Sequence, residues 1–69
     1  MSTTLYRLLT GPDDASFCHR VSDALSKGWQ LHGPPSLTYD VEQMKVICAQ
    51  AITKQVAADY SADMKLSDQ

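Results

Sequence analysis

The chain has few cysteines, glycines and prolines, and it has no long apolar run. Its two cysteines, Cys18 and Cys48, form no Cys-x-x-Cys pair, so a disulfide framework is not indicated and we expect reduced thiols. No run approaches the roughly 20 apolar residues that a membrane-spanning helix requires. Residues 1–4 lead into a strand-like run rather than an apolar signal core. We therefore expect a cytoplasmic protein with no membrane partner.

Positive charge is also scarce. Six Lys and Arg against eight Asp and Glu give a formal net charge of −2, and the basic residues are dispersed between Arg7 and Lys65. Binding to nucleic acid requires a concentrated basic surface. The sequence therefore argues against a nucleic-acid partner.

The length of 69 residues allows one domain. A chain this short buries only about 60% of the surface that its unfolded form exposes, so its core is marginal unless something reinforces it. Since neither disulfides nor a metal motif is evident, we expect reinforcement by association, most simply as a homodimer.

One helix is predicted between Asp14 and Gly28. Asp13 or Asp14 can accept hydrogen bonds from the free N–H groups of the first turn, and Gly28 can adopt the left-handed conformation that ends a helix. Apolar residues recur between them at spacings of three and four, which is typical of a helix with one packed face. These residues are Ala15, Phe17, Cys18, Val21, Ala24 and Leu25.

Three segments have strand character. Residues 5–9 place Tyr6 and Leu8 on one face and the remaining three residues on the other. Residues 29–39 are predicted to form a kinked edge strand, because two prolines interrupt them. For residues 44–54 a helix is the alternative to a strand, and their β-branched pairs favour the strand.

These elements predict an α+β fold of order β-α-β-β. The sheet has three strands, residues 44–54 lie at its centre, and the helix covers one face. We expect residues 1–54 to form a single compact domain and residues 55–69 a polar tail, either loose or docked on a neighbouring subunit. The possible anchors of this tail are Tyr60, Met64 and Leu66.

The second face of such a sheet is left bare. We predict that Leu5 and Leu9 contribute to this face and that an oligomer covers it. Among the aromatic residues, Trp29, Tyr6 and Phe17 are predicted to form most of the core.

Four blocks of sequence carry a family resemblance: residues 6–14 (YRLLTGPDD), 17–21 (FCHRV), 28–33 (GWQLHG) and 64–69 (MKLSDQ). Together they resemble a family of short bacterial proteins, the domain-of-unknown-function family seventeen thirty-seven, over nearly the whole chain. The resemblance implies a small bacterial α+β domain. It carries no established activity and no catalytic residues to transfer.

The residues that could support catalysis do not form a recognisable site. Cys18 and His19 point about 100° apart on a helix, so a thiolate–imidazole pair would need Cys18 with His32, or Cys48 with either histidine, across the fold. The same four residues lack the tight pairs of a zinc site. We interpret both cysteines as packing thiols and predict no catalytic residue, no metal ligand and no cofactor.

Two surfaces are candidates for binding. On the helix, His19 and Asp23 are spaced to pair, and Arg20 lies in the adjacent row, where it could meet an acidic partner. Gly33, Pro34 and Pro35 form a candidate recognition loop. Tyr39 follows them at a sheet edge where another chain could add a strand.

The leading hypothesis is a non-enzymatic protein-interaction module that self-associates and offers His19, Arg20 or the edge from Gly33 to Tyr39 to a protein partner. The alternative is a small-ligand or metal-binding domain, or a minor thiol-dependent enzyme. Its site would use Cys18, His32 or Cys48 at a subunit interface.

Overall fold

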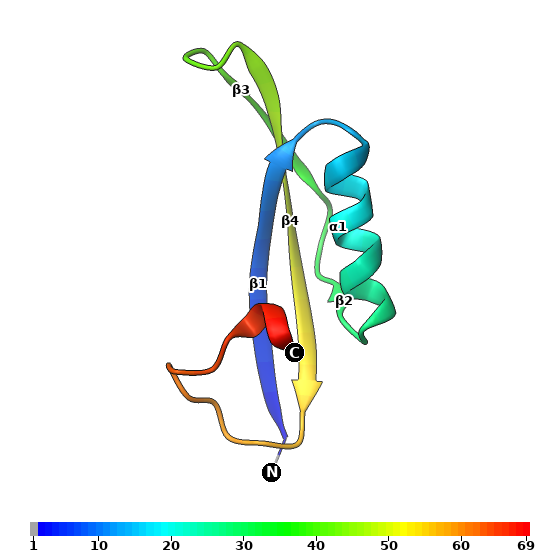
Figure 1. The fold of residues 1–69 in the computed structure, drawn as a ribbon, viewed down its shortest axis with the longest axis vertical. Helices are drawn as coiled ribbons and strands as arrows, with labels where there is room; N and C mark the ends of the chain where they lie inside the picture. The colour runs from blue at the N-terminus through cyan, green and yellow to red at the C-terminus, as the bar shows by residue number, and fades with distance from the viewer. Residues whose placement is uncertain (1) are drawn as a thin grey trace.

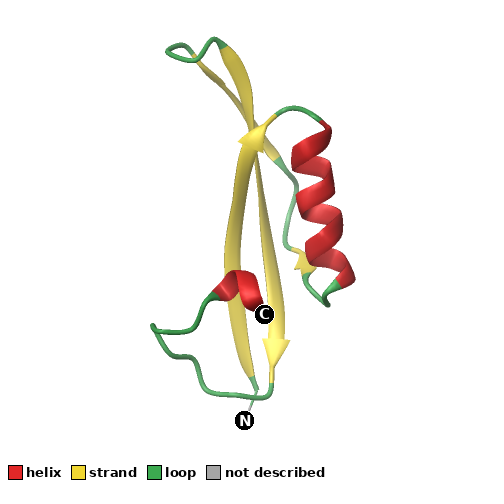
Figure 2. Ribbon diagram, in the orientation of Figure 1, coloured by secondary structure: helices red, strands yellow, loops and turns green. Residues whose placement is uncertain are grey.

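Within residues 2–69, one α-helix packs along one side of an antiparallel sheet of four strands (Figures 1 and 2). The computed structural model describes residues 2–69. The α+β class and the helix on one face are as predicted. In chain order the elements are β1 (Thr3–Pro12), α1 (Ala15–Ser26), β2 (Gln30–Leu31), β3 (Ser36–Asp40), β4 (Lys45–Val56) and the 3₁₀ turn η1 (Leu66–Asp68).

Strand β4 lies at the centre of the sheet, as predicted for residues 44–54. It pairs with β1 along ten residues on one side, and with both β2 and β3 on its other side. The expected single kinked strand is therefore two separate strands along one edge. The reason lies between them, where Gly33 has φ +78° and Pro34 and Pro35 have no N–H to donate.

The helix begins and ends where its capping residues predict. Asp14 has extended backbone geometry and its Oδ1 accepts a hydrogen bond from the Ser16 N–H at 2.9 Å, which satisfies one free donor of the first turn. Gly28 follows the last turn with φ +97°. Within residues 2–69, no helix is both long enough and apolar enough to cross a membrane.

The hairpin of β3 and β4 extends past the end of β1 (Figure 1). Its turn is closed by Asp40, whose carboxylate accepts from the N–H groups of Glu42 and Gln43. The side chains of Val41 and Met44 in this turn are largely exposed. The hairpin therefore forms an arm that little else in the chain covers.

The core lies entirely between the sheet and the segments on the helix side. Its buried apolar members are Leu5, Leu9, Phe17, Ala24, Trp29, Cys48 and Ile52. The C-terminal segment folds back across the lower part of the sheet (Figure 1), and Ser67 within it lines a hollow together with residues of α1 and β1. There Met64 and Leu66 pack against the core, whereas Tyr60 is exposed. Two of the three expected anchors of the tail thus pack on the chain's own core.

The chain is more extended than a compact domain of its size. Its radius of gyration is 13.6 Å, compared with about 11 Å for a compact chain of this length. Its accessible surface is 4978 Å², compared with about 4,300 Å² for a typical monomer of this mass. The excess follows from a sheet covered on one face and a hairpin that extends beyond its cover.

Candidate functional site

The two faces of the sheet differ in what covers them. Leu5 and Leu9 are 1% and 3% exposed, whereas Tyr6 and Leu8 on the opposite face are 55% and 54% exposed. The pairing register places Ala51 of β4 opposite Leu8. We call the surface formed by Tyr6, Leu8, Thr10, Ile47, Ala49, Ala51 and Thr53 the open face.

The prediction that Leu5 and Leu9 contribute to the bare face is wrong. Alternation along β1 was assigned correctly, but the helix covers the face opposite to the expected one. On that face the partners on β4 include Ile52, which is fully buried, whereas the open face has the small side chains Ala49 and Ala51. Covering the face with the larger side chains removes more apolar surface from water.

Tyr6 was expected in the core and lies instead on the open face. Its strand position has the same parity as Leu8, so both side chains project away from the helix. Phe17 and Trp29 are buried as predicted. The core therefore has two aromatic residues, and Tyr6 is available for contact with another molecule.

The candidate residues on α1 are exposed, but their contacts differ from those expected. Asp23 pairs with Lys27 at 3.0 Å rather than with His19. The guanidinium of Arg20 turns toward the sheet and donates to the Thr10 carbonyl oxygen at 2.6 Å. His19 and Arg20 therefore do not form one outward-facing pair.

The loop at Gly33, Pro34 and Pro35 is exposed, as is Tyr39. The side chain of Gln50 supports this loop by donating from Nε2 to the Gly33 carbonyl oxygen at 3.1 Å. The loop lies at the outer edge of the sheet, apart from the open face and from the charged part of α1.

The two cysteines have opposite environments. Cys48 is buried in β4 as predicted, and its Sγ donates to Asp13 Oδ1 at 3.5 Å. Burial raises the pKa of the Cys48 thiol, and the neighbouring Asp13 carboxylate raises it further. Cys18 is exposed, so its predicted packing role is wrong. It lies on the same helical row as Leu25, which is also exposed, at the rim of the apolar stripe.

Within residues 2–69, no three His, Cys, Asp or Glu side chains are grouped so that they could hold a metal ion. The hydrogen-bond partner of the Cys48 thiol is a carboxylate rather than an imidazole. This arrangement raises the pKa of the thiol and so opposes formation of the nucleophilic thiolate.

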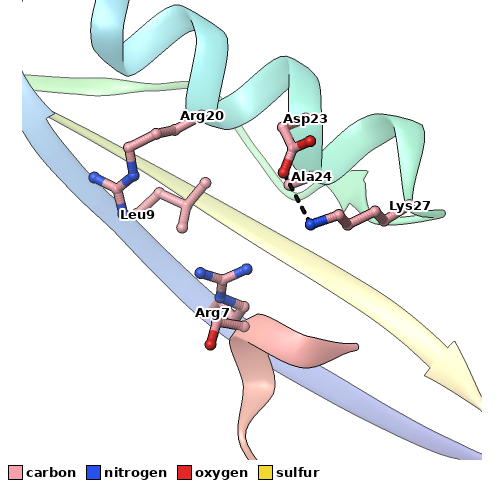
Figure 3. Close-up of a pocket in the computed structure, with 7 residues that line it drawn as sticks. Arg7, Leu9, Arg20, Asp23, Ala24 and Lys27 are labelled. Carbon is pink, nitrogen blue, oxygen red and sulfur yellow. Dashed lines mark ion pairs between the residues drawn. The ribbon is translucent and has the colours of Figure 1, made fainter.

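A hollow of about 140 Å³ lies between α1, β1 and the C-terminal turn. Arg7 and Arg20 reach toward it from β1 and α1, and the Asp23–Lys27 pair lies beside it (Figure 3). Ser67 of η1 completes its lining. We call this the basic hollow.

The side chains of the basic hollow are partly fixed by neighbours. The guanidinium of Arg7 lies 5.5 Å from the centre of the Trp29 ring, a cation–π distance. Lys54 Nζ lies 6.0 Å from the centre of the Trp29 ring and donates to the Gln69 carbonyl oxygen. Sequence reasoning missed Arg7, Lys27 and Ser67. Period-two alternation does place Arg7 on one face with Leu5 and Leu9, but this face was expected to be bare, so Arg7 was not expected near the helix.

A second, shallower hollow of about 260 Å³ lies on the other flank of α1. Its lining is mainly apolar, and it includes Phe17, Cys18, Val21 and Leu31. Leu31 lines this hollow and remains 54% exposed.

The fold and its surfaces define a small α+β domain whose sheet is covered by a helix on one face. The family described as Domain of unknown function (DUF1737) matches residues 3–55, which confirms the resemblance. The chain belongs to this family. No curated protein and no solved structure matches it. The family match ends within β4, so the C-terminal turn that lines the basic hollow lies outside it.

Proposed function

We propose that this chain is a non-enzymatic interaction module that self-associates by placing the open face of one copy against the open face of a second copy. The observation that carries this proposal is the contrast between the two faces of one strand. Leu8 is half exposed while the adjacent Leu9 is buried, and no helix or strand among residues 2–69 covers the surface on which Leu8 lies.

The composition of the open face supports a second copy as the occupant. Its residues from β1 and β4 include no charged side chain; the first charged pair in register is Asp40 with Lys45, out on the hairpin. In a symmetric dimer the same patch meets itself. An uncharged face can do so without placing like charges together.

The accessible surface of the chain is large for its mass, at 4978 Å² compared with about 4,300 Å² for a typical monomer. If a second copy covered the open face, part of this excess surface would be removed from water.

The hairpin arm is a weaker candidate for the same role. Its exposed residues Val41 and Met44 alternate with Asp40, Glu42 and Lys45. These charged side chains favour contact with water, and in a symmetric contact they would meet copies of themselves.

The proposal is tested by light scattering on the wild type and two matched variants at micromolar concentration. Leu8 and Leu31 have the same 54% exposure, but Leu31 lies on the helix side of the sheet. We expect a dimeric wild type, a monomeric Leu8→Asp variant and a dimeric Leu31→Asp variant.

Three results would contradict the proposal. The first is a monomeric wild type at all concentrations, and the second is a Leu8→Asp variant that remains dimeric. The third is a dimer that Leu37→Asp on β3 dissociates while Leu8→Asp leaves it intact, which would assign the interface to the hairpin arm. The circular dichroism of each variant shows that it is folded before its mass is interpreted.

A further inference from the structure

The basic hollow concentrates positive charge in a chain whose net charge is −2. Of the six Lys and Arg residues, Arg7, Arg20 and Lys27 line it, and Asp23 is the one acidic residue in its lining. The sequence alone suggests dispersed charge. The fold brings these three residues together from β1, from the middle of α1 and from its C-cap, which is Lys27.

Two of the three positive charges have no acidic partner. The carboxylate of Asp23 pairs with Lys27, and within residues 2–69 neither Arg7 nor Arg20 forms an ion pair with a carboxylate. The lining of the hollow therefore carries a net charge of about +2. A dianion would neutralise it.

Both guanidinium groups are held in place while keeping donors free. Arg20 uses one N–H for the Thr10 carbonyl oxygen, and Arg7 is positioned by the ring of Trp29. A guanidinium has five N–H donors in a planar fork, so each side chain retains several for a ligand. The Ser67 hydroxyl at the edge of the hollow adds a neutral donor.

We propose that the basic hollow binds a tetrahedral oxyanion: inorganic phosphate or sulfate, or the phosphate group of a small metabolite. A water molecule occupies about 30 Å³, so the 140 Å³ hollow has the volume of roughly four water molecules, which suits a ligand as small as phosphate. Several oxygens on one ligand can accept from both forks at once, and Arg is suited to this geometry.

The position of the hollow adds a structural consequence. Its lining joins α1 and β1 to the C-terminal turn η1, so a bound oxyanion would link the C-terminal segment to the rest of the domain. The hollow lies on the helix side of the sheet, away from the open face, and the proposal does not depend on self-association.

The test is a titration of the ¹⁵N-labelled chain with inorganic phosphate at pH 7, followed by NMR at an ionic strength held constant with sodium chloride. We expect saturable shifts at the backbone N–H groups of Arg7, Arg20 and Ser67 and at the side-chain N–H groups of the two arginines. Sulfate should shift the same signals, and it should compete with phosphate.

Matched variants separate a specific site from general attraction between charges. Arg20→Gln should weaken phosphate binding by at least about tenfold, since it removes one charge and one fork. Lys45→Gln removes the same charge at the far hairpin and should leave binding unchanged. Arg20→Lys keeps the charge without the fork and should give an intermediate affinity.

Arg7→Gln also removes a contact with Trp29. It therefore tests the contribution of the Arg7 guanidinium to phosphate binding when the circular dichroism of the variant shows that it is folded. Arg20 is exposed, and its substitution gives the decisive result in any case. The proposal is overturned if phosphate gives no saturable shift beyond that of chloride. It is equally overturned if Lys45→Gln weakens binding as much as Arg20→Gln does.

Discussion

The covered and open faces of the sheet are built from the same two strands, β1 and β4. Alternate residues of each strand project to opposite faces. On the covered face, Leu5, Leu9 and Ile52 contact the helix and the C-terminal segment; on the open face, Tyr6 and Leu8 meet solvent. The difference teaches that strand β1 serves two purposes at once. One set of its side chains holds the domain together, and the alternate set is free to contact another molecule.

The largest difference is expected between truncations of two neighbouring leucines, Leu9 on the covered face and Leu8 on the open face. Leu9→Ala should lower the free energy of unfolding by about 3 kcal/mol, because it removes buried methyl groups and leaves a cavity. Leu8→Ala should lower the free energy of unfolding of the monomer by less than about 0.5 kcal/mol. Urea unfolding, followed by the fluorescence of Trp29 at a concentration below that of association, measures both. Equal losses would show that the faces are not distinct.

A second prediction applies the same contrast to the two thiols. Cys18 is exposed, whereas Cys48 is buried with a raised pKa. In the native state Cys18 should react with a thiol reagent at least about ten times faster than Cys48. Timed labelling with a disulfide reagent at pH 8 measures both rates, and Cys18→Ser should abolish the fast phase. If the fast phase survives this substitution, Cys48 is accessible and the packing described for β4 is incorrect.

The smallest effect concerns the anchoring of the covering helix. The hydrogen bond from Ser16 lowers the pKa of Asp14 below its ordinary 3.8. A carboxyl group with a lowered pKa in the folded state adds stability above its unfolded pKa, and this contribution is lost as pH falls through the folded pKa. The pH window is therefore below about 4.

Two substitutions at this position separate the cap from its charge. Asp14→Ala should lower the urea midpoint at pH 7, because the first helical turn loses its cap. Asp14→Asn keeps a side-chain oxygen, so it should retain most of the stability and show a weaker acid dependence. Asp59→Ala, at an exposed position in the C-terminal segment, is the control. An unchanged acid limb in Asp14→Asn would contradict the role assigned to the carboxylate.

Local signals in the sequence predicted much of the fold. Asp14 and Gly28 act at the two ends of the helix as expected, because capping depends on residues that are close in sequence. The β-branched residues of β4 correctly favoured a strand over a helix. Pro34 and Pro35 indicated an interruption, although not that the pieces on either side would be two separate strands.

The functional surfaces were less predictable, since they depend on contacts between distant residues. Alternation in β1 placed the side chains of Leu8 and Leu9 on opposite faces of the sheet. Alternation alone does not determine which of these faces the helix covers. Arg7 and Arg20 are 13 residues apart in the sequence, and only the packing of α1 on β1 brings them to one hollow. The position of Ser67 depends in addition on how the C-terminal segment folds back.

The central claim is that the open face contacts a second copy of itself, and isotope-filtered NMR on a mixture of ¹³C-labelled and unlabelled chains tests it most directly. We predict intermolecular contacts between the Tyr6 ring or Leu8 methyl groups of one copy and the Ala49 and Ala51 methyl groups of its partner. The absence of such contacts in a sample that is dimeric by light scattering, or their restriction to Val41 and Met44 of the hairpin, would contradict the account.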